Sequence, residues 1–196
     1  MTLSLRERTR GAVRDEVMRC AWILFAEQGY AATTVEQVAE AAGMSRRTFF
    51  RYFANKDDLV LQRMLESSQQ LADELAARPA DEPAWQALRA AFDPVLEVQR
   101  GKRDFVLRLL GMIHGEIELS AALQTRDRRW RALLTPLVAE RLPASADPAV
   151  TQARAGAVAA SALACLHASQ LAWLDHPDAD PGTLLDAAMG AVAPLG

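Results

Sequence analysis

The stretch from residue 33 to residue 56 constrains the fold more than any other part of the chain. It reads TTVEQVAEAAGMSRRTFFRYFANK and contains two short segments with apolar residues at helical spacing. Thr34 and Gln37 have the spacing of a capping box, which predicts a helix that starts directly after Thr34. Gly43 lies between the two segments, and a glycine permits the positive φ angle of a sharp bend. The pattern predicts a helix-turn-helix.

The second helix of this unit is predicted over residues 46–53, with Ser45 as its N-cap. In a helix-turn-helix that binds duplex DNA, the first residues of this helix lie at the base edges of the major groove. Arg46 and Arg47 occupy these positions, and arginine can form two hydrogen bonds with O6 and N7 of guanine. The methyl group of Thr48 can contact a thymine methyl. These residues favour a double-stranded DNA partner, although similar helix pairs also occur in helical proteins that bind no DNA.

The residues that follow divide between the core and the surface. Phe49 and Phe53 are four positions apart, so both are expected to point into the core of the module. Phe50 lies on another face, where it can contact a thymine methyl or a sugar. The phenol of Tyr52 can reach a phosphate, and Lys56 starts the next helix, where a cation suits a phosphate contact.

Charge is distributed unevenly along the chain. Residues 1–56 carry nine Lys/Arg against six Asp/Glu, whereas the whole chain has a net charge of −3. A basic N-terminal part on an acidic remainder is typical of a protein in which one module faces phosphate and the other does not.

Helical patterns continue through the rest of the chain. Hydrophobic residues make up 51% of the sequence, alanine is frequent, and no alternating strand pattern occurs. Further helices are predicted over residues 10–28, 56–77, 84–100 with a kink at Pro94, 103–114, 120–142 with a bend at Pro136, 149–174 and 183–192. Together with the two helices of the helix-turn-helix, they predict an all-α fold of about nine helices.

The stretch CAWILFAEQGYAATTVEQVAEAAGMSRRTFFRYFANKDDLV resembles the N-terminal domain of TetR-family transcription regulators. The resemblance holds in order and spacing over about residues 10–60. It implies an N-terminal three-helix DNA-binding domain over residues 1–56 and a C-terminal helical domain for ligand binding and dimerisation over residues 57–196. It also implies base or phosphate contacts from Thr34, Arg46, Arg47, Thr48, Phe50, Tyr52 and Lys56.

The chain departs from the usual family pattern at two of these positions. It has Arg47 where many members have glycine, which adds a side chain that can contact a base. It has Phe50 where many members have tyrosine, so a hydroxyl that could bond phosphate is absent and the role of Phe50 stays open. The SRRTFFRYF segment resembles an actinobacterial-type subgroup with acyl-CoA-like ligand binding, which implies a long hydrophobic effector.

Two C-terminal segments have the composition of a dimer interface. Residues 154–174 are rich in glycine, alanine and serine, which let another helix approach closely, and residues 183–192 carry apolar residues on one side. The expected interface consists of Gly156, Ala160, Leu163, Leu184, Leu185, Ala188 and Val192. The alternative is that this face packs within one subunit; a palindromic operator, which needs a two-fold protein, favours the homodimer.

A ligand pocket is expected between the helices of the C-terminal domain, because helical bundles commonly hold such sites in their cores. The candidate lining residues are Trp85, Phe92, Phe105, Arg108, Leu109, Met112, Trp130, Leu134, His167 and Gln170. For each aromatic residue the alternative is a plain core position. His114, Glu116 and Glu118 follow no familiar zinc pattern, so no metal and no cofactor is expected.

The remaining features concern the compartment and the class of protein. Cys20 and Cys165 are far apart in apolar stretches, as expected for buried thiols in a reducing compartment. The longest apolar run, residues 155–166, is shorter than a membrane span and rich in alanine. The N-terminal arginines are not followed by the apolar stretch of a secretion signal. These features predict a cytoplasmic protein without a membrane partner, and neither a nucleophile–base pair nor a metal cluster suggests an enzyme.

The sequence thus predicts a homodimeric, ligand-responsive transcriptional repressor that binds a palindromic operator. A small hydrophobic or acyl-CoA-like effector would release it from DNA. The alternative is a DNA-binding regulator without an effector, in which the C-terminal bundle only dimerises or binds a protein partner.

Overall fold

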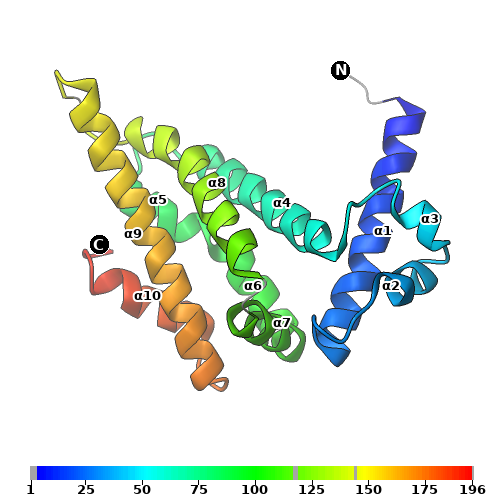
Figure 1. Cartoon of the computed structure of the whole chain (residues 1–196). Helices are drawn as coiled ribbons and strands as arrows, with labels where there is room; N and C mark the ends of the chain where they lie inside the picture. The colour runs from blue at the N-terminus through cyan, green and yellow to red at the C-terminus, as the bar shows by residue number, and fades with distance from the viewer. Residues whose placement is uncertain (1–3, 117–118, 144, 196) are drawn as a thin grey trace.

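The structure, a computed structural model, describes residues 4–116, 119–143 and 145–195, and these residues form helices and no strand (Figure 1). The all-α fold class is therefore confirmed. A small module contains α1 (Leu5–Gln28), α2 (Val35–Ala41) and α3 (Arg46–Phe49). From it, α4 (Lys56–Ala77) leads into a bundle of α5 (Ala84–Ala91), α6 (Asp93–Gly101), α7 (Arg103–Gly115), α8 (Ser120–Ala139), α9 (Pro148–Asp175) and α10 (Pro181–Gly190).

The local signals of the helix-turn-helix are present in the structure as predicted. The Thr34 side chain accepts a hydrogen bond from the backbone N–H of Gln37, and the Gln37 side chain accepts one from the backbone of Thr34, which completes the capping box. Gly43 has a φ angle of +66° in the turn between α2 and α3. The Ser45 side chain caps α3 by accepting from the backbone N–H of Thr48.

Helix α3 is shorter than predicted and ends at Phe49 instead of continuing to Phe53. The backbone N–H of Tyr52 donates to the carbonyl of Phe49 at 2.8 Å, which is the tighter i to i−3 pattern. The chain therefore turns tightly after one turn of helix. This turn brings Phe49 and Phe53 back toward α1.

The side chains of Phe49 and Phe53 are at most 1% exposed, as predicted. They share an apolar cluster with Val17 and Phe25 of α1. The same cluster extends beyond the module. It also includes residues of α4 and α7, among them Ile113. The apolar cluster of the module thus extends to two helices of the bundle, α4 and α7.

The bundle is built on α4, α8, α9 and α10, which pack in that order, with α5 also against α9 (Figure 1). Its core is a second apolar cluster that includes Leu88, Phe92 and Leu134, all fully buried. Arg141 closes one end of the bundle, because its Nη2 donates to the carbonyls of Leu75 at 2.9 Å and Arg78 at 3.0 Å. These bonds satisfy carbonyls at the C-terminal end of α4.

The predicted helix over residues 84–100 is two helices in the structure. α5 ends at Ala91, and α6 begins at Asp93 with Pro94 in its first turn. Proline has no backbone N–H, so it fits the first turn of a helix and interrupts the hydrogen bonds of a longer one. Pro136 has a milder effect, since α8 continues through it to Ala139.

Helix α10 is held against the bundle by ion pairs. Arg100 of α6 contacts Asp180 at 2.7 Å, and Arg89 of α5 contacts Asp186. Arg100 keeps the pKa of the Asp180 carboxyl well below its ordinary value, and the same carboxylate caps α10 by accepting from the backbone N–H of Thr183. A Cβ atom at Gly182 would collide with the Arg100 guanidinium, so a side chain there would require Arg100 to move.

Helix α9 is more apolar than the short run in the sequence suggests. Within the described residues it is the one helix long and apolar enough to suit a membrane span, with 44% of its most apolar window buried. Its buried residues, such as Ala159, Ala162 and Leu166, belong to the bundle core. Packing against α8 and α10 accounts for the buried part of this composition.

The positive φ angle of Gly43 gives a test of the turn. Gly43→Ala should lower the free energy of unfolding by about 1–2 kcal/mol, because an L-residue in the left-handed region is strained. No atom lies within 4 Å of the added Cβ, so strain alone would be measured. Urea unfolding followed by circular dichroism provides the measurement.

Gly11→Ala is the matched control, since Gly11 lies inside α1 and its added Cβ also meets nothing within 4 Å. It should raise the stability by about 0.5–1 kcal/mol. Equal effects of both substitutions would contradict the role given to the Gly43 turn.

Candidate nucleic-acid interface and ligand pocket

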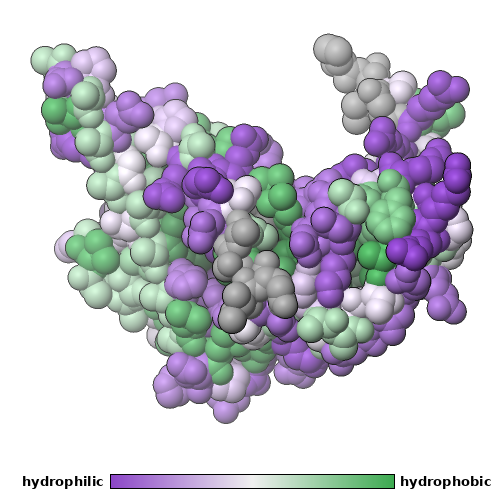
Figure 2. All heavy atoms as spheres, viewed as in Figure 1, coloured by the Kyte–Doolittle hydropathy of each residue, from purple (hydrophilic) through white to green (hydrophobic). Residues whose placement is uncertain are grey.

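The start of α3 presents its side chains to solvent because its apolar residues are buried against α1. Arg46 and Arg47 are exposed, and Phe50 retains 45% of its surface. Hydrophilic side chains gather over this side of the molecule, around α1 to α3 (Figure 2). The residues predicted to contact bases therefore lie on one accessible surface.

The two arginines differ in their surroundings. Arg46 forms an ion pair with Glu36 of α2 at 3.0 Å, and its guanidinium lies 5.5 Å from the centroid of the Phe50 ring. Arg47 has no ion pair among the described residues. Glu36 and Phe50 therefore orient Arg46, whereas Arg47 is the more available cation. The sequence analysis did not foresee the role of Glu36, although its position on the neighbouring helix was visible.

Thr34, Thr48 and Tyr52 are fixed by contacts within the module. Thr34 is exposed and acts as the N-cap of α2, and the Thr48 hydroxyl lies 2.9 Å from the Ser45 hydroxyl. Tyr52 is half-buried, and its carbonyl accepts a hydrogen bond from Arg14 of α1 at 3.3 Å. These contacts give the loop and the end of the recognition segment a defined position.

The structure places Lys56 differently from the sequence expectation. Its ammonium group turns inward and donates to the carbonyls of Tyr30 at 2.6 Å, Thr33 at 3.2 Å and Ala31 at 3.5 Å. The same group lies 4.0 Å from the centroid of the Tyr30 ring. Since a lysine has three donors, these bonds use all of them within the protein. Lys56 thus secures the loop between α1 and α2. In this geometry its ammonium group has no donor left for the phosphate contact that was predicted from the sequence.

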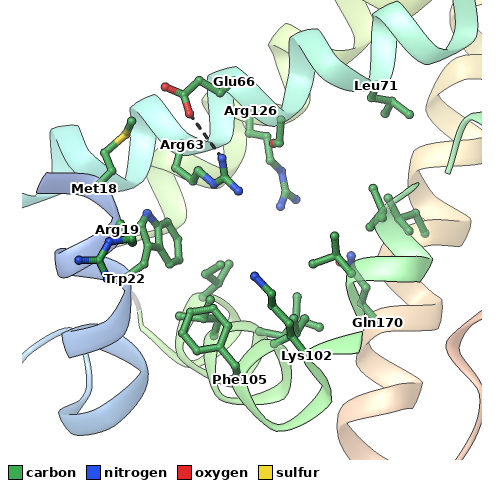
Figure 3. A pocket seen from close by; sticks show the side chains of 18 of the residues that line it. Met18, Arg19, Trp22, Arg63, Glu66, Leu71, Lys102, Phe105, Arg126 and Gln170 are labelled. Carbon is green, nitrogen blue, oxygen red and sulfur yellow. Dashed lines mark ion pairs between the residues drawn. The ribbon is translucent and has the colours of Figure 1, made fainter. Parts of the chain in front are cut away.

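A cavity of about 700 Å³ lies between the module and the bundle. Figure 3 shows its walls: Met18, Arg19 and Trp22 on one side, Lys102 and Phe105 on another, and Gln170 opposite α1. Helices α1, α4, α6, α7, α8 and α9 all contribute residues. A mainly apolar cavity of this size, with a few charged groups, suits a small molecule with an apolar body.

Four of the residues predicted to line a pocket do so: Phe105, Leu109, Trp130 and Gln170. The others lie elsewhere. Phe92 and Leu134 are fully buried in the bundle core, Met112 belongs to the module cluster, Arg108 is exposed, and Trp85 donates its indole N–H to the carbonyl of Ala193. His167 lines a neighbouring cavity of about 350 Å³.

Sequence reasoning missed the α1 wall and Arg126. Arg126 is 9% exposed and lines both cavities, and its guanidinium lies 4.5 Å from the centroid of the Trp130 ring. One signal was available: Arg126 stands four and eight residues before Trp130 and Leu134, on the buried stripe of the same helix. A charge on a buried stripe indicates a functional position. No comparable signal marks α1.

Two histidines meet beside these cavities. The rings of His114 on α7 and His167 on α9 have centroids 4.7 Å apart. Burial, together with His167 and Arg126, lowers the pKa of His114 to about 4. No group of three or more His, Cys, Asp or Glu side chains suited to a metal occurs among the described residues, and Glu118 of the sequence pattern lies outside them.

The residues expected at a dimer interface divide between surface and core. Leu185 is fully buried and Leu163 is 8% exposed in the core of their own subunit, so neither is available to a partner. Ala188 packs against the same core, whereas Val192 is 57% exposed. The half-buried members are Gly156, Ala160 and Leu184. The exposed small residues of α9, such as Ala157 and Ala164, lie on a different face of the helix from Leu163.

Comparison with known proteins finds a match to each of two separate parts of the chain. Residues 17–62 match the family described as bacterial regulatory proteins, tetR family, and residues 82–195 match the MftR C-terminal domain. The HTH-type transcriptional regulator TcmR of Streptomyces glaucescens is 34% identical over 143 residues, which cover 70% of this chain and 63% of TcmR. The chain thus spans less than two-thirds of the length of that relative.

Solved structures share the fold at low sequence identity. FadR of Bacillus subtilis, in complex with stearoyl-CoA, superposes with a TM-score of 0.66 at 15% identity, covering 92% of this chain and 98% of that one. FadR of Thermus thermophilus, a TetR-family repressor in complex with lauroyl-CoA, gives 0.58 at 22% identity, covering 91% and 92%. At these identities the likeness establishes the arrangement of helices.

The inward position of Lys56 predicts a structural effect of its removal. Lys56→Met should lower the free energy of unfolding by about 1.5–3 kcal/mol, because it leaves carbonyls without their charged donor. The measurement is denaturant unfolding. Arg47→Met, on the exposed start of α3, is the control and should stay within about 0.5 kcal/mol of the wild type. Equal stabilities of both variants would assign Lys56 to the surface instead.

The low pKa of His114 predicts a pH-dependent stability. The ordinary value is 6.5 and the folded value is about 4, so between these values the unfolded chain binds the proton and the folded chain does not. The contribution of His114 to the free energy of unfolding is therefore fully present above pH 6.5 and is lost as the pH falls toward 4. Because the ring is only half-buried, we expect a loss of about 1–2 kcal/mol.

Urea unfolding at pH 7.5 and pH 5.0 measures this loss. His114→Gln should flatten the dependence, whereas His176→Gln, at an exposed position, should leave it as in the wild type. An unchanged slope in His114→Gln would assign the pH dependence to other groups.

Proposed function

Because this chain belongs to the TetR family of bacterial transcriptional regulators, we propose that it is a cytoplasmic, ligand-responsive repressor that binds a palindromic operator as a homodimer. The family and the fold are those of regulators and not of enzymes. The observation that carries the proposal is the rigidly held start of α3, where two arginines face solvent beside buried phenylalanines.

In this proposal Arg46, Arg47 and Thr48 read base edges in the major groove. Arginine can bind guanine through two hydrogen bonds, and the packing of Phe49 presents both arginines outward. Phe50 lies beside Arg46 and is exposed, so it contacts a thymine methyl or a sugar. Base contacts of this kind supply the specificity of the complex.

Thr34 and Tyr52 anchor the module on the phosphate backbone. Thr34 lies at the N-terminus of α2, where backbone N–H groups favour a phosphate. The contribution of Lys56 is indirect: its ammonium group fixes the loop that carries Thr34. A phosphate bond from Lys56 itself would require it to give up one of its carbonyl partners.

The homodimer would form through α9 and α10. Val150, Ala157, Ala164 and Leu171 recur at every seventh residue of α9, and all four are exposed. Less hydrophilic surface lies along α9 and α10 in Figure 2. An exposed apolar stripe at this spacing, with two alanines at its centre, lets the same helix of a second subunit pack against it, and α10 completes a four-helix interface. Two recognition helices would then lie about one helical turn of DNA apart, roughly 34–36 Å.

The cavity supports an effector that is hydrophobic or acyl-CoA-like. Its walls combine aromatic and aliphatic residues, including Phe105 and Leu109, with a few charged groups. Two proteins of the same fold were crystallised with stearoyl-CoA and lauroyl-CoA. The alternative, a regulator with no effector, predicts a filled core at this place, and a cavity of about 700 Å³ argues against it.

A binding assay with operator DNA tests the proposal. Fluorescence anisotropy with palindromes from the chain's own promoter should show sequence-specific binding at moderate salt. Arg46→Ala or Arg47→Ala should weaken this binding by about 1–3 kcal/mol and relax the preference at one base pair. Arg131→Ala, an exposed arginine of α8, is the control and should keep the wild-type affinity.

Two results would contradict the proposal. One is the absence of specific binding to any palindrome near the gene. The other is an Arg47→Ala variant that weakens all sequences equally and lowers the salt dependence by about one charge, since that is the behaviour of a phosphate contact.

A further inference from the structure

One wall of the ligand cavity belongs to the DNA-binding module itself. We propose that an anionic amphiphile bound in this cavity touches α1 directly, so that the effector acts on the module through α1 as well as through α4. This inference rests on the proposed function and assigns the ligand-contacting residues and the route of regulation within it.

The α1 wall is a single stripe of the helix. Asp15, Met18, Arg19, Trp22 and Ile23 all line the cavity, at the i, i+3, i+4, i+7 and i+8 spacing of one helix face. Figure 3 shows three of them, Met18, Arg19 and Trp22, across the cavity from Gln170 of α9. A ligand long enough to fill the space between α1 and α9 therefore contacts both the module and the bundle.

Two residues of this stripe also belong to the core of the module. Met18 is 5% exposed and Trp22 is 9% exposed, and both lie in the apolar cluster that holds Phe49 and Phe53. Each of the two residues therefore borders the cavity and also belongs to the apolar cluster of the module. A displacement of Trp22 by a ligand is therefore a displacement within the core of the module.

A row of aromatic contacts continues from Trp22 toward the helix-turn-helix. The centroids of Trp22 and Phe25 are 5.9 Å apart, and those of Phe25 and Tyr30 are 5.1 Å apart. Lys56 lies over the Tyr30 ring and binds the loop before α2. Interiors are close-packed, so a shift at one end of such a row changes the packing at the other.

The charged groups of the cavity specify the kind of ligand. Its lining contains four cationic side chains, Arg19, Arg63, Lys102 and Arg126, against the carboxylates Asp15 and Glu66. Two of these cations are paired with carboxylates outside the lining, Arg19 with Glu16 at 2.6 Å and Arg126 with Asp127 at 3.1 Å. Among the lining residues themselves, cations outnumber carboxylates by two. The rest of the lining is largely apolar. An apolar chain with an anionic end is complementary to both features.

Arg126 is the cation best placed to hold the anionic end. It is 9% exposed and extends into the space between α4 and Lys102 in Figure 3. Its Nε and Nη2 both donate to one oxygen of Asp127, at 3.1 Å each, and Asp127 itself is half-exposed. A buried guanidinium bound to one oxygen of a neighbouring carboxylate retains donors for an anionic ligand.

Photo-crosslinking tests the α1 contact without reference to DNA. The probe is dodecanoate with a diazirine in its chain, bound to the full-length protein and mapped by mass spectrometry. We expect crosslinks in the segment 15–23 of α1 as well as in α7. Crosslinks confined to α4 through α9, or no saturable binding of the probe, would overturn the inference.

Competition distinguishes the two sources of this chemistry. Unlabelled laurate and lauroyl-CoA each compete with the probe, and the stronger competitor shows whether a free carboxylate or a thioester is held. Neutral dodecanol should compete at least 10-fold less well, and Arg126→Gln should remove most of that difference. Equal competition by dodecanol and both anions in the wild type would overturn the anionic part of the inference.

A pair of matched truncations tests the regulation. Ile23 on α1 and Val98 on α6 both line the cavity, and neither belongs to the module core. For each variant we compare the operator affinity without probe and at saturating laurate or lauroyl-CoA. Ile23→Ala should reduce this ratio at least 5-fold, whereas Val98→Ala should weaken ligand binding and retain the wild-type ratio at saturation. Equal ratios in the two variants would overturn regulation through α1.

The two proposals fail in different ways. If the wild-type protein binds its operator and no probe changes that affinity, the ligand response of the proposed function fails, and regulation through α1 is overturned with it. If the probe releases the operator and the crosslinks avoid α1, the proposed function stands and this inference alone is overturned.

Discussion

The packing of Phe49 and Phe53 against α1 is the contact on which the exposed surface at the start of α3 depends. Helix α3 has four residues, and a helix of that length is unstable in water without tertiary support. Both rings are buried within the module, and that burial fixes the outward direction of Arg46 and Arg47. The cation on Arg14 adds to this attachment, since its guanidinium lies 5.0 Å from the centroid of the Phe53 ring.

Because so much depends on α1, its second contact surface matters. The helix packs on α2 on one side and on α7 on another, and its stripe from Asp15 to Ile23 borders the cavity. The apolar cluster of the module therefore runs without a break to Ile113 of α7. Helix α1 therefore does two things: it supports the helix-turn-helix, and it forms one wall of the cavity.

Features that depend on neighbours along the chain were predictable. The capping box at Thr34, the positive φ angle of Gly43 and the burial of Phe49 each follow from a few consecutive residues. The division at Pro94 was predicted as a kink and is a helix end, because the strength of a proline break depends on what the flanking helices pack against. The all-α class followed from composition and periodicity alone.

The sequence by itself determined most of the helices, the caps of α2 and α3 and the exposed arginines at the start of α3, because these are encoded by spacing within one or two helical turns. The tertiary structure decided which charged and apolar residues share a site. Lys56 was indistinguishable from a surface lysine until the carbonyls of the α1–α2 loop lay beside it. Leu184 and Leu185 are adjacent and identical in sequence, and only packing separates the half-buried Leu184 from the fully buried Leu185. The cavity draws its walls from six helices, so no local pattern could indicate that α1 closes it.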